Sequence, residues 1–264
     1  MRLEEASRWV FNKMADVYEA RPPYPATLVD ALAALAGAPG ARIADLGAGT
    51  GHLALPLAAR GYDVTAVEPA GEMLARLRAA AAARRLPLRA AHATAETLPI
   101  EPRALDLVVV ADALHFMDAQ LVGEEIARVL KRGGALAVVT AALGDTPYMR
   151  AVRAIIDESV PRRPRALDGH LVHVSSTTEV PFGQARVFHD ETPVDHVTLE
   201  RILRSISFIG PAMNPARFAA FRARVHALPG RPVWARTFTV REGRRVRRRD
   251  STAAVPARVA LATL

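Results

Sequence analysis

The segment Ile43–Gly51 reads Ile-Ala-Asp-Leu-Gly-Ala-Gly-Thr-Gly, so an acidic residue, Asp45, precedes three alternating glycines. Glycine permits positive φ and leaves room for a ligand against the main chain. A dinucleotide-binding loop would place its third glycine where His52 stands, and a phosphate loop would need Gly-Lys-Ser or Gly-Lys-Thr, which is absent here. These residues favour a site for a nucleoside that carries no pyrophosphate.

A second acidic residue, Glu68, follows the next apolar segment, about 20 residues after Gly47. A carboxylate at this spacing can accept hydrogen bonds from both hydroxyls of a ribose. S-adenosylmethionine (SAM) and NAD both carry a free 2′-hydroxyl, so Glu68 predicts a ribose without choosing between them.

The elements that would position these residues alternate along the chain. Short apolar segments predict buried strands, and periodic segments between them predict helices. The predicted strands are Arg42–Leu46, Asp63–Val67, Leu88–His92, Leu105–Ala111 and Ala135–Thr140, followed by Arg186–Glu191 and Pro232–Val240. The predicted helices are Glu4–Tyr18, Ala26–Leu35, one ending at Arg60, Gly71–Arg85, Leu121–Leu130, Met149–Ser159, Thr198–Phe208 and Ala216–Ala227.

This order predicts an α/β fold with a doubly wound, Rossmann-like sheet. We expect seven strands, mostly parallel with an antiparallel edge strand, and helices on both faces of the sheet. The two late strands, which follow five alternating units, are the reason for expecting the antiparallel edge.

Composition narrows the classes of function. The chain of 264 residues has no cysteine, which excludes disulfides, thiol nucleophiles and Cys-ligated zinc. No segment reaches the roughly 18–20 apolar residues that span a bilayer, and the acidic residues near the N-terminus do not suit a secretory signal. We expect a cytoplasmic protein without membrane contact.

The formal net charge of +8 invites a nucleic-acid interpretation. Only Lys13 and Lys131 are lysines, and the arginines are dispersed except for the cluster Arg241–Arg249. Such a cluster could contact phosphates, but a solvated edge or tail is the preferred interpretation, so nucleic acid is not expected as a partner. The sequence does not indicate the oligomeric state.

Five motifs in register resemble a known family. In order they are Asp45-x-Gly47-x-Gly49-x-Gly51, Val67-Glu68-Pro69 with Met73, Ala95-Glu96-x-Leu98-Pro99, Asp106-Leu107-Val108 leading to Ala113-Leu114-His115-Phe116, and Arg128-Val129-Leu130-Lys131-x-Gly133-Gly134. They resemble the class I SAM-dependent methyltransferases, and more narrowly the small-molecule branch (type 11) with the trans-aconitate methyltransferase-like proteins. The resemblance covers residues 10–140 and is looser toward the C-terminus.

The resemblance implies SAM as cofactor and assigns residues to its parts. Asp45 and Gly47 would face the methionine part, and Glu68 would hold the ribose diol. Pro69 and Met73 would pack on the adenine. The full set of implied cofactor-binding residues is Tyr18, Asp45, Gly47, Ala48, Gly49, Gly51, Glu68, Pro69, Met73, Ala95, Glu96 and Ala111.

The resemblance also divides the chain into regions. Residues 1–40 would form an N-terminal helical lid, and residues 41–142 and 183–242 the SAM-binding core. Residues 143–182 would form an insertion that contributes to the acceptor pocket, and residues 243–264 a basic tail. One departure from the family is Phe116, where the family usually has Trp, so the shape of the acceptor is left open.

Methyl transfer from a sulfonium needs alignment above all, and a general base only if the acceptor must lose a proton early. His115 is the candidate base or acceptor-binding residue, because it follows the fourth strand and titrates near neutrality; a structural histidine is the alternative. Asp112 would orient acceptor or cofactor, or else cap a helix. His170 and His173 lack a third ligand, so no metal site is expected.

Three functions remain open at this point. The first is methyl transfer to an O or N atom of a small molecule, for example in natural-product biosynthesis (secondary metabolism). The second is an RNA or protein methyltransferase, for which the cluster Arg241–Arg249 is the support. The third is a SAM-binding protein without transferase activity. The absence of cysteine disfavours arsenite methylation, and no Asn-Pro-Pro-Tyr motif follows the fourth strand.

Overall fold

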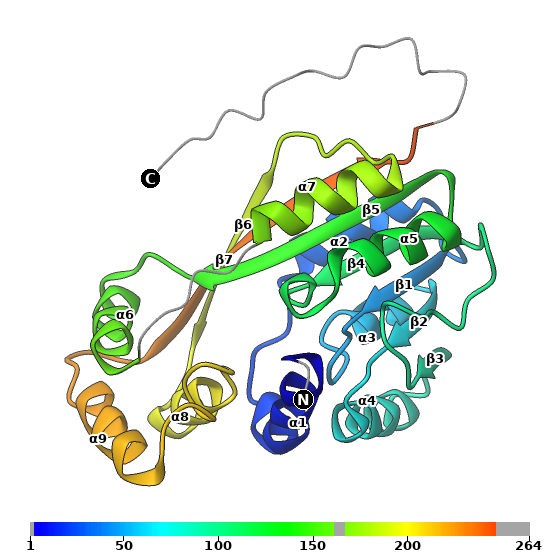
Figure 1. Ribbon diagram of the computed structural model, residues 1–264. Coiled ribbons are helices and arrows are strands. Elements are labelled where there is room, and N and C mark those ends of the chain that lie inside the picture. The colour runs from blue at the N-terminus through cyan, green and yellow to red at the C-terminus, as the bar shows by residue number, and fades with distance from the viewer. Residues whose placement is uncertain (1–2, 161–166, 247–264) are drawn as a thin grey trace.

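The computed structural model describes residues 3–160 and 167–246, and within them the chain forms one sheet in the order β3-β2-β1-β4-β5-β7-β6 (Figure 1). Strands β1 to β5 pair in parallel, whereas β7 runs antiparallel to both of its neighbours. The strands are β1 Arg42–Leu46, β2 Asp63–Val67, β3 Leu88–Ala91, β4 Leu105–Ala111, β5 Leu130–Leu143, β6 Arg186–Pro193 and β7 Val233–Arg244. The predicted seven-stranded, mostly parallel sheet is confirmed.

The central strands are apolar on both sides because helices cover both faces of the sheet. Alternation along β1 sends Ile43 into one apolar cluster and Ala44 and Leu46 into another. In β4, Val109 faces the first cluster and Val110 the second. This two-sided burial fixes the register of the strands that carry the site at their carboxyl ends.

Helices complete the two layers. On one face α2 (Ala26–Ala36) and α3 (Ala54–Ala59) bury Leu28 and Leu57, and on the other α5 (Ala119–Val129) and α7 (Leu167–Thr178) pack against each other. Helix α4 (Gly71–Ala83) contacts β3 and α1 (Leu3–Tyr18). The short 3-10 helix η1 (Leu114–Phe116) follows β4.

A third apolar cluster lies beyond the ends of β5, β6 and β7. It is built by α6 (Pro147–Ser159), α8 (His196–Arg204) and α9 (Pro215–His226), which stand together below those strands (Figure 1). Trp234 at the start of β7 is buried in this cluster. The group α6, α8 and α9 is called the cap below.

The region 143–182, which we expected to form an insertion, contains the predicted helix at Met149–Ser159 and a second helix. Strand β5 continues to Leu143, α6 joins the cap, and α7 returns to cover the sheet beside α5. Helix α7 was not predicted from sequence. It forms because Leu171 and Val174 are buried against α5, and tertiary contacts of this kind stabilise segments of weak helix propensity.

The basic region near the C-terminus is partly built into the sheet. Strand β7 extends through Arg244, whose guanidinium donates to the carbonyls of Leu35 and Gly133. Arg245 donates to the carbonyl of Leu130 and pairs with Glu179. The rest of the predicted tail, from residue 247 onward, lies outside the described residues. Among the described helices, none has the length and apolar character to cross a membrane.

Candidate functional site

A cavity of about 1320 Å³ opens at the carboxyl ends of β1, β2 and β4, where the strand order reverses direction. Ligands of doubly wound sheets bind at this topological position. The cavity brings together the following residues predicted from sequence: Tyr18, Asp45, Gly47, Ala48, Gly49, Glu68, Pro69, Met73, Ala95, Glu96, Ala111, Asp112 and His115. The predicted residue Gly51 does not line it.

The three glycines of the loop therefore have different roles. Gly47 has a φ of +74°, and a Cβ there would lie 2.6 Å from the Cβ of Ala113, so no side chain fits. Gly49 lines the cavity and has a φ of +57°. Gly51 is instead needed for packing, because a Cβ there would lie 3.0 Å from Leu55 and Leu77. A direct contact of Gly51 with the cofactor stays a prediction.

Glu68 is held rigidly at the end of β2. Its Oε2 accepts from the Gly49 amide at 2.8 Å, and its Oε1 accepts from the Ala70 amide at 2.8 Å. Only 6% of its surface is exposed, and burial raises its pKa. A carboxylate oxygen has two lone pairs, so each oxygen keeps one with which to accept a hydroxyl. The carboxylate is thus oriented by main-chain donors and fits a vicinal diol.

Asp45 at the end of β1 is buried to 1% exposure, and its Oδ2 has no hydrogen-bond partner. Burial, followed by the nearby carboxylate of Glu68, raises the pKa of Asp45 to about 7. A buried acceptor without a partner is costly, and a cationic ligand group would remove that cost. This geometry fits the ammonium group of an amino-acid moiety.

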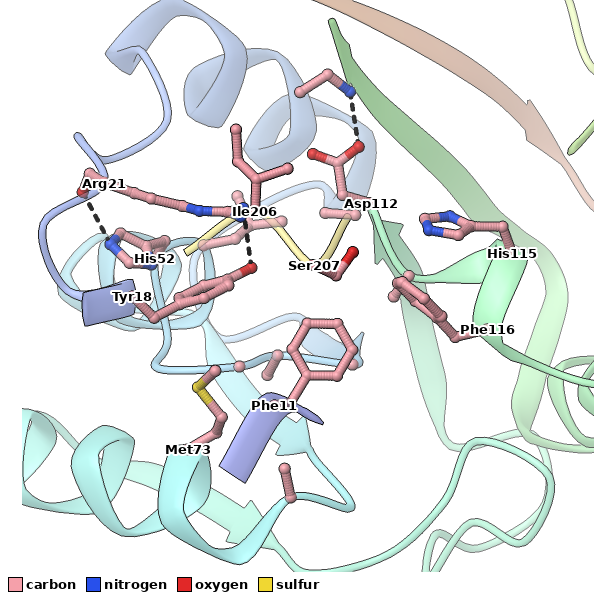
Figure 2. Close-up of a pocket in the computed structure, with 18 of the residues that line it drawn as sticks. Phe11, Tyr18, Arg21, His52, Met73, Asp112, His115, Phe116, Ile206 and Ser207 are labelled. Atoms are coloured by element: carbon pink, nitrogen blue, oxygen red, sulfur yellow. Dashed lines mark hydrogen bonds between the residues drawn. The ribbon is translucent and has the colours of Figure 1, made fainter. Parts of the chain in front are cut away.

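Asp112 lies at the end of β4 in a left-handed conformation, with a φ of +52°. Its amide donates to the Val139 carbonyl at 2.9 Å, and its Oδ1 accepts from the Ala141 amide at 2.7 Å (Figure 2). These bonds tie the residue to β5. This side-chain hydrogen bond goes to a strand, and the predicted roles of Asp112, orienting a ligand or capping a helix, stay predictions.

His115 stands in η1 with its ring centroid 3.9 Å from that of Phe116. Phe116 in turn meets Phe11 of α1 edge-on, with centroids 5.2 Å apart. Figure 2 shows His115 and Phe116 on the side of the cavity opposite Tyr18 and His52. A role for His115 in proton transfer stays a prediction.

Known proteins are similar to this chain in sequence. A family model described as a methyltransferase domain matches residues 44–138, which hold β1 through β5 and the glycine loop. Residues 44–138 thus match a methyltransferase domain. It is 44% identical over 131 residues to an uncharacterized methyltransferase of Mycobacterium bovis, and this match covers 49% of the chain and 51% of the relative. The chain thus spans about half the length of the curated relatives it matches.

Solved structures share the fold of the methyltransferase domain. A candidate type II methyltransferase of Anaeromyxobacter dehalogenans has a TM-score of 0.61 at 23% identity, covering 86% of this chain and 98% of the other. A geranyl diphosphate methyltransferase solved in complex with SAM has a TM-score of 0.52 at 13% identity, covering 83% of this chain and 85% of the other. At identities of 23% and 13%, the similarity to these structures supports the fold of the chain alone.

Arg21 closes the methyltransferase domain's cavity from the N-terminal side. Its Nε donates to the Ser205 hydroxyl and a terminal nitrogen to the Ser205 carbonyl, both at 2.7 Å. The guanidinium also stacks on the Tyr18 ring, 4.2 Å from its centroid, and donates to the Tyr18 hydroxyl at 3.3 Å (Figure 2). The segment after α1 and the residue that follows α8 are therefore joined directly beside the cavity.

His52 fastens the same segment to the glycine loop. Its Nε2 lies 3.1 Å from the Arg21 carbonyl, and its Nδ1 lies 3.1 Å from the Thr50 hydroxyl. Burial, and then the charge of Arg21, lower the pKa of His52 to about 4, so the ring is neutral and Nε2–H is the donor. Sequence reasoning used His52 only to exclude a dinucleotide loop and missed this contact.

Another part of the cavity lies between the N-terminal segment, strands β5 and β7, the cap and the segments that join the cap helices. It is lined by Tyr24, Leu143, Arg153, Val160, Ile206, Ser207, Phe208, Ala212, Arg217, Trp234 and Phe238. Most of these were missed from sequence, because lone side chains on amphipathic helices carry no local signal of ligand contact. Tyr24 both lines the cavity and packs on Phe238, with ring centroids 5.3 Å apart.

The two histidines with i, i+3 spacing lie on α7 rather than in a loop. His170 lines the cavity and His173 is exposed. Within the part of the chain that the structure describes, no three acidic or histidine residues gather closely enough to hold a metal ion.

Proposed function

We propose that the chain is a SAM-dependent methyltransferase that moves a methyl group to an O or N atom of a small-molecule acceptor. The observation that carries the proposal is the pair Asp45 and Glu68 at neighbouring strand ends, both buried and both facing one cavity. Small-molecule sites usually measure about 300–1000 Å³. A cavity of about 1320 Å³ supports two ligands, a nucleoside donor and an acceptor.

The residues present fit SAM. Asp45 would bind its ammonium group, and Glu68 would accept both ribose hydroxyls while Gly49 and Ala70 hold the carboxylate in place. Met73, which is buried in the wall, and Pro69 would pack against the adenine. When bound, SAM supplies a methyl group already activated as a sulfonium. The chain's own residues then have to align the acceptor and exclude water.

His115 would take the acceptor's proton where one must leave. It lines the cavity beside Asp112, whose main chain and carboxylate are fixed to β5. A neutral imidazole at the cavity wall can accept a proton from an O–H or N–H group. The volume of the cavity supports a small acceptor, for example in natural-product biosynthesis, and a cytoplasmic location stays part of the proposal.

The first test is calorimetric titration with SAM and with its demethylated product, S-adenosylhomocysteine (SAH). Glu68→Gln should weaken binding by about 1–3 kcal/mol, because two hydroxyls lose a charged acceptor. Glu72→Gln is the matched control, since Glu72 is exposed on α4 and does not line the cavity. Absence of binding by both ligands would overturn the proposal.

The acceptor class is tested with methyl-deuterated SAM added to fractionated cell extract. We expect the label in the small-molecule fraction, detected by mass spectrometry. Label confined to RNA or to protein would replace the proposed acceptor class. Tight SAH binding without label in any fraction would favour a SAM-binding protein that has no transferase activity.

A further inference from the structure

The cap presents two arginines to the cavity, Arg153 from α6 and Arg217 from α9. These helices pack against each other and lie side by side below the end of β7 (Figure 1). Arg153 is half-buried in the wall, and Arg217 is exposed at the start of α9. Both therefore reach the half of the cavity that the donor residues leave to the acceptor.

The hydrogen bonds of both guanidinium groups leave donors available. Arg153 uses one terminal nitrogen, which donates to the carbonyls of Leu143 at 2.6 Å and Gly144 at 3.4 Å. Arg217 uses one terminal nitrogen, which donates to the Ser159 carbonyl at 2.8 Å. In residues 3–160 and 167–246, their Nε and other terminal nitrogens form no further hydrogen bond.

Their charge is also not neutralised by the surrounding protein. Over the described ranges, neither Arg153 nor Arg217 forms an ion pair, whereas Arg236 in the same wall is paired with Asp190. Carbonyl oxygens satisfy donors, but they do not cancel a positive charge. The two guanidinium groups thus keep a net positive field at the cap side of the cavity.

The negative groups that line the cavity lie elsewhere. Asp45 lies near the end of β1, and Glu68 and Asp112 follow β2 and β4. Glu96 belongs to the loop between β3 and β4, where it accepts from the Asp118 amide at 3.0 Å. The cavity is therefore acidic where the cationic donor is proposed to lie and basic at the cap. Trp234 and Phe238 add apolar surface to the same cavity.

We infer that the acceptor carries an anionic group, a carboxylate or a phosphate, and that Arg153 and Arg217 bind it. This inference rests on the proposed function and adds the chemical class of the acceptor. Guanidinium groups bind both anions through charge-assisted, often paired hydrogen bonds. The anion is held at the cap, so another part of the acceptor faces His115 and the methyl group.

The test compares charged and neutral probes on the SAH-loaded protein. Phenylacetate, 3-phenylpropionate and phenyl phosphate are titrated beside phenylacetamide and 3-phenylpropionamide, with binding followed by ligand-observed NMR at pH 8. At least one of the three anions should bind about tenfold more tightly than the two neutral amides. The tighter of carboxylate and phosphate identifies which anion the site prefers. Equal binding of anions and amides, or binding by none of them, overturns the inference.

Substitutions of the two arginines test whether these residues cause the preference for anions. Arg153→Met and Arg217→Met should each reduce the preference for the anion severalfold, and the double variant should abolish it. Arg150→Met is the control, because Arg150 lies on the same helix α6, pairs with Asp145 and does not line the cavity. A preference that survives the double variant contradicts the assignment of these two residues.

SAH affinity and thermal unfolding are measured on every variant. Unchanged values show that the loss concerns the anion and not the fold. Arg153 also binds carbonyls at the end of β5, so Arg217→Met and Arg153→Lys carry the test if Arg153→Met does not fold. If the proposed function is wrong, the wild-type protein will not bind SAH. This outcome differs from a failure of the anion inference, in which SAH binds but anions and amides bind equally.

Discussion

The ionised carboxylate of Asp45 lowers the stability of the ligand-free protein, and the same charge is proposed to bind the ammonium group of the ligand. Its carboxylate is buried, has one oxygen without a partner and lies near a second carboxylate, so its pKa is raised to about 7. An acid whose folded pKa exceeds its unfolded value binds protons more tightly when folded. The free energy of unfolding therefore falls as pH rises from about 4 through about 7.

Asp45→Asn should relieve this cost in the ligand-free protein. At pH 8 we expect the free energy of unfolding to rise by about 1–3 kcal/mol, because no buried charge remains. At pH 4, where Asp45 is protonated, the substitution should have little effect. Urea unfolding at both pH values measures the difference, and equal changes at the two would contradict the assigned titration.

The same titration should appear in cofactor affinity. The ammonium group of SAH needs Asp45 ionised, so the association constant should fall by up to about tenfold per pH unit below pH 7. In Asp45→Asn this slope should disappear, and binding should be weak throughout. Calorimetry between pH 5.5 and 8.5 provides the profile, and a flat profile in the wild-type protein would argue against the role of Asp45.

Sequence identified Asp45 and Glu68 because both follow apolar strands at a spacing that strand ends dictate. It did not identify Arg153 or Arg217, because arginine is abundant in this chain and only packing decides which ones reach a cavity. His52 was visible as a departure from a glycine motif. Its contact with Arg21 depends on a lid that lies far away in the sequence.

At the scale of the element, the β1–α3 turn works through close approach of main chains. Gly47→Ala should destabilise the protein by more than about 2 kcal/mol and strongly weaken SAH binding, because its Cβ meets Ala113 at 2.6 Å. Gly37→Ala is the control, since Gly37 also has positive φ but an added Cβ there would meet nothing within 4 Å. Similar losses for both would show that backbone strain alone matters.

Strands β1, β2 and β4 were predicted from sequence with the bounds that the structure has, because a strand buried on both faces is an unbroken apolar run bounded by turns. Strand β5 spans Leu130–Leu143 and is longer than the predicted Ala135–Thr140. Helix α7 could not be predicted. It contains Gly169 and several β-branched residues, which favour helix weakly. Its stability comes from contact with α5, where Gly123 leaves room for Thr177. Tertiary contacts of this kind have no local trace.

At the scale of the whole molecule, Arg236 connects the two ends of the chain. From β7 it donates to the carbonyls of Pro22 at 2.9 Å and Pro23 at 2.6 Å, and it pairs with Asp190 of β6. Its surface is only 9% exposed. The N-terminal lid is thereby anchored to the C-terminal strand that supports the cap.

Arg236→Met should lower the free energy of unfolding by about 2–4 kcal/mol, because Asp190 and two carbonyls lose their donor in a buried setting. Asp190→Asn combined with it should restore part of the loss. Arg224→Met, which removes an exposed pair with Glu158, should change stability by less than about 0.5 kcal/mol. A loss in Arg236→Met as small as in this control would contradict the anchoring role.

The helices α8 and α9 leave the sheet after β6 and return at β7. The Val194 amide donates to the Pro232 carbonyl at 3.1 Å, and Pro193 pairs with Val233, so this excursion is closed at its base. Doubling the length of a closed loop costs only about 0.6 kcal/mol in chain entropy. Evolution can therefore lengthen, shorten or replace the segment that holds α8 and α9 at low cost in stability. The strand register, and with it the donor end of the cavity, stays as it is.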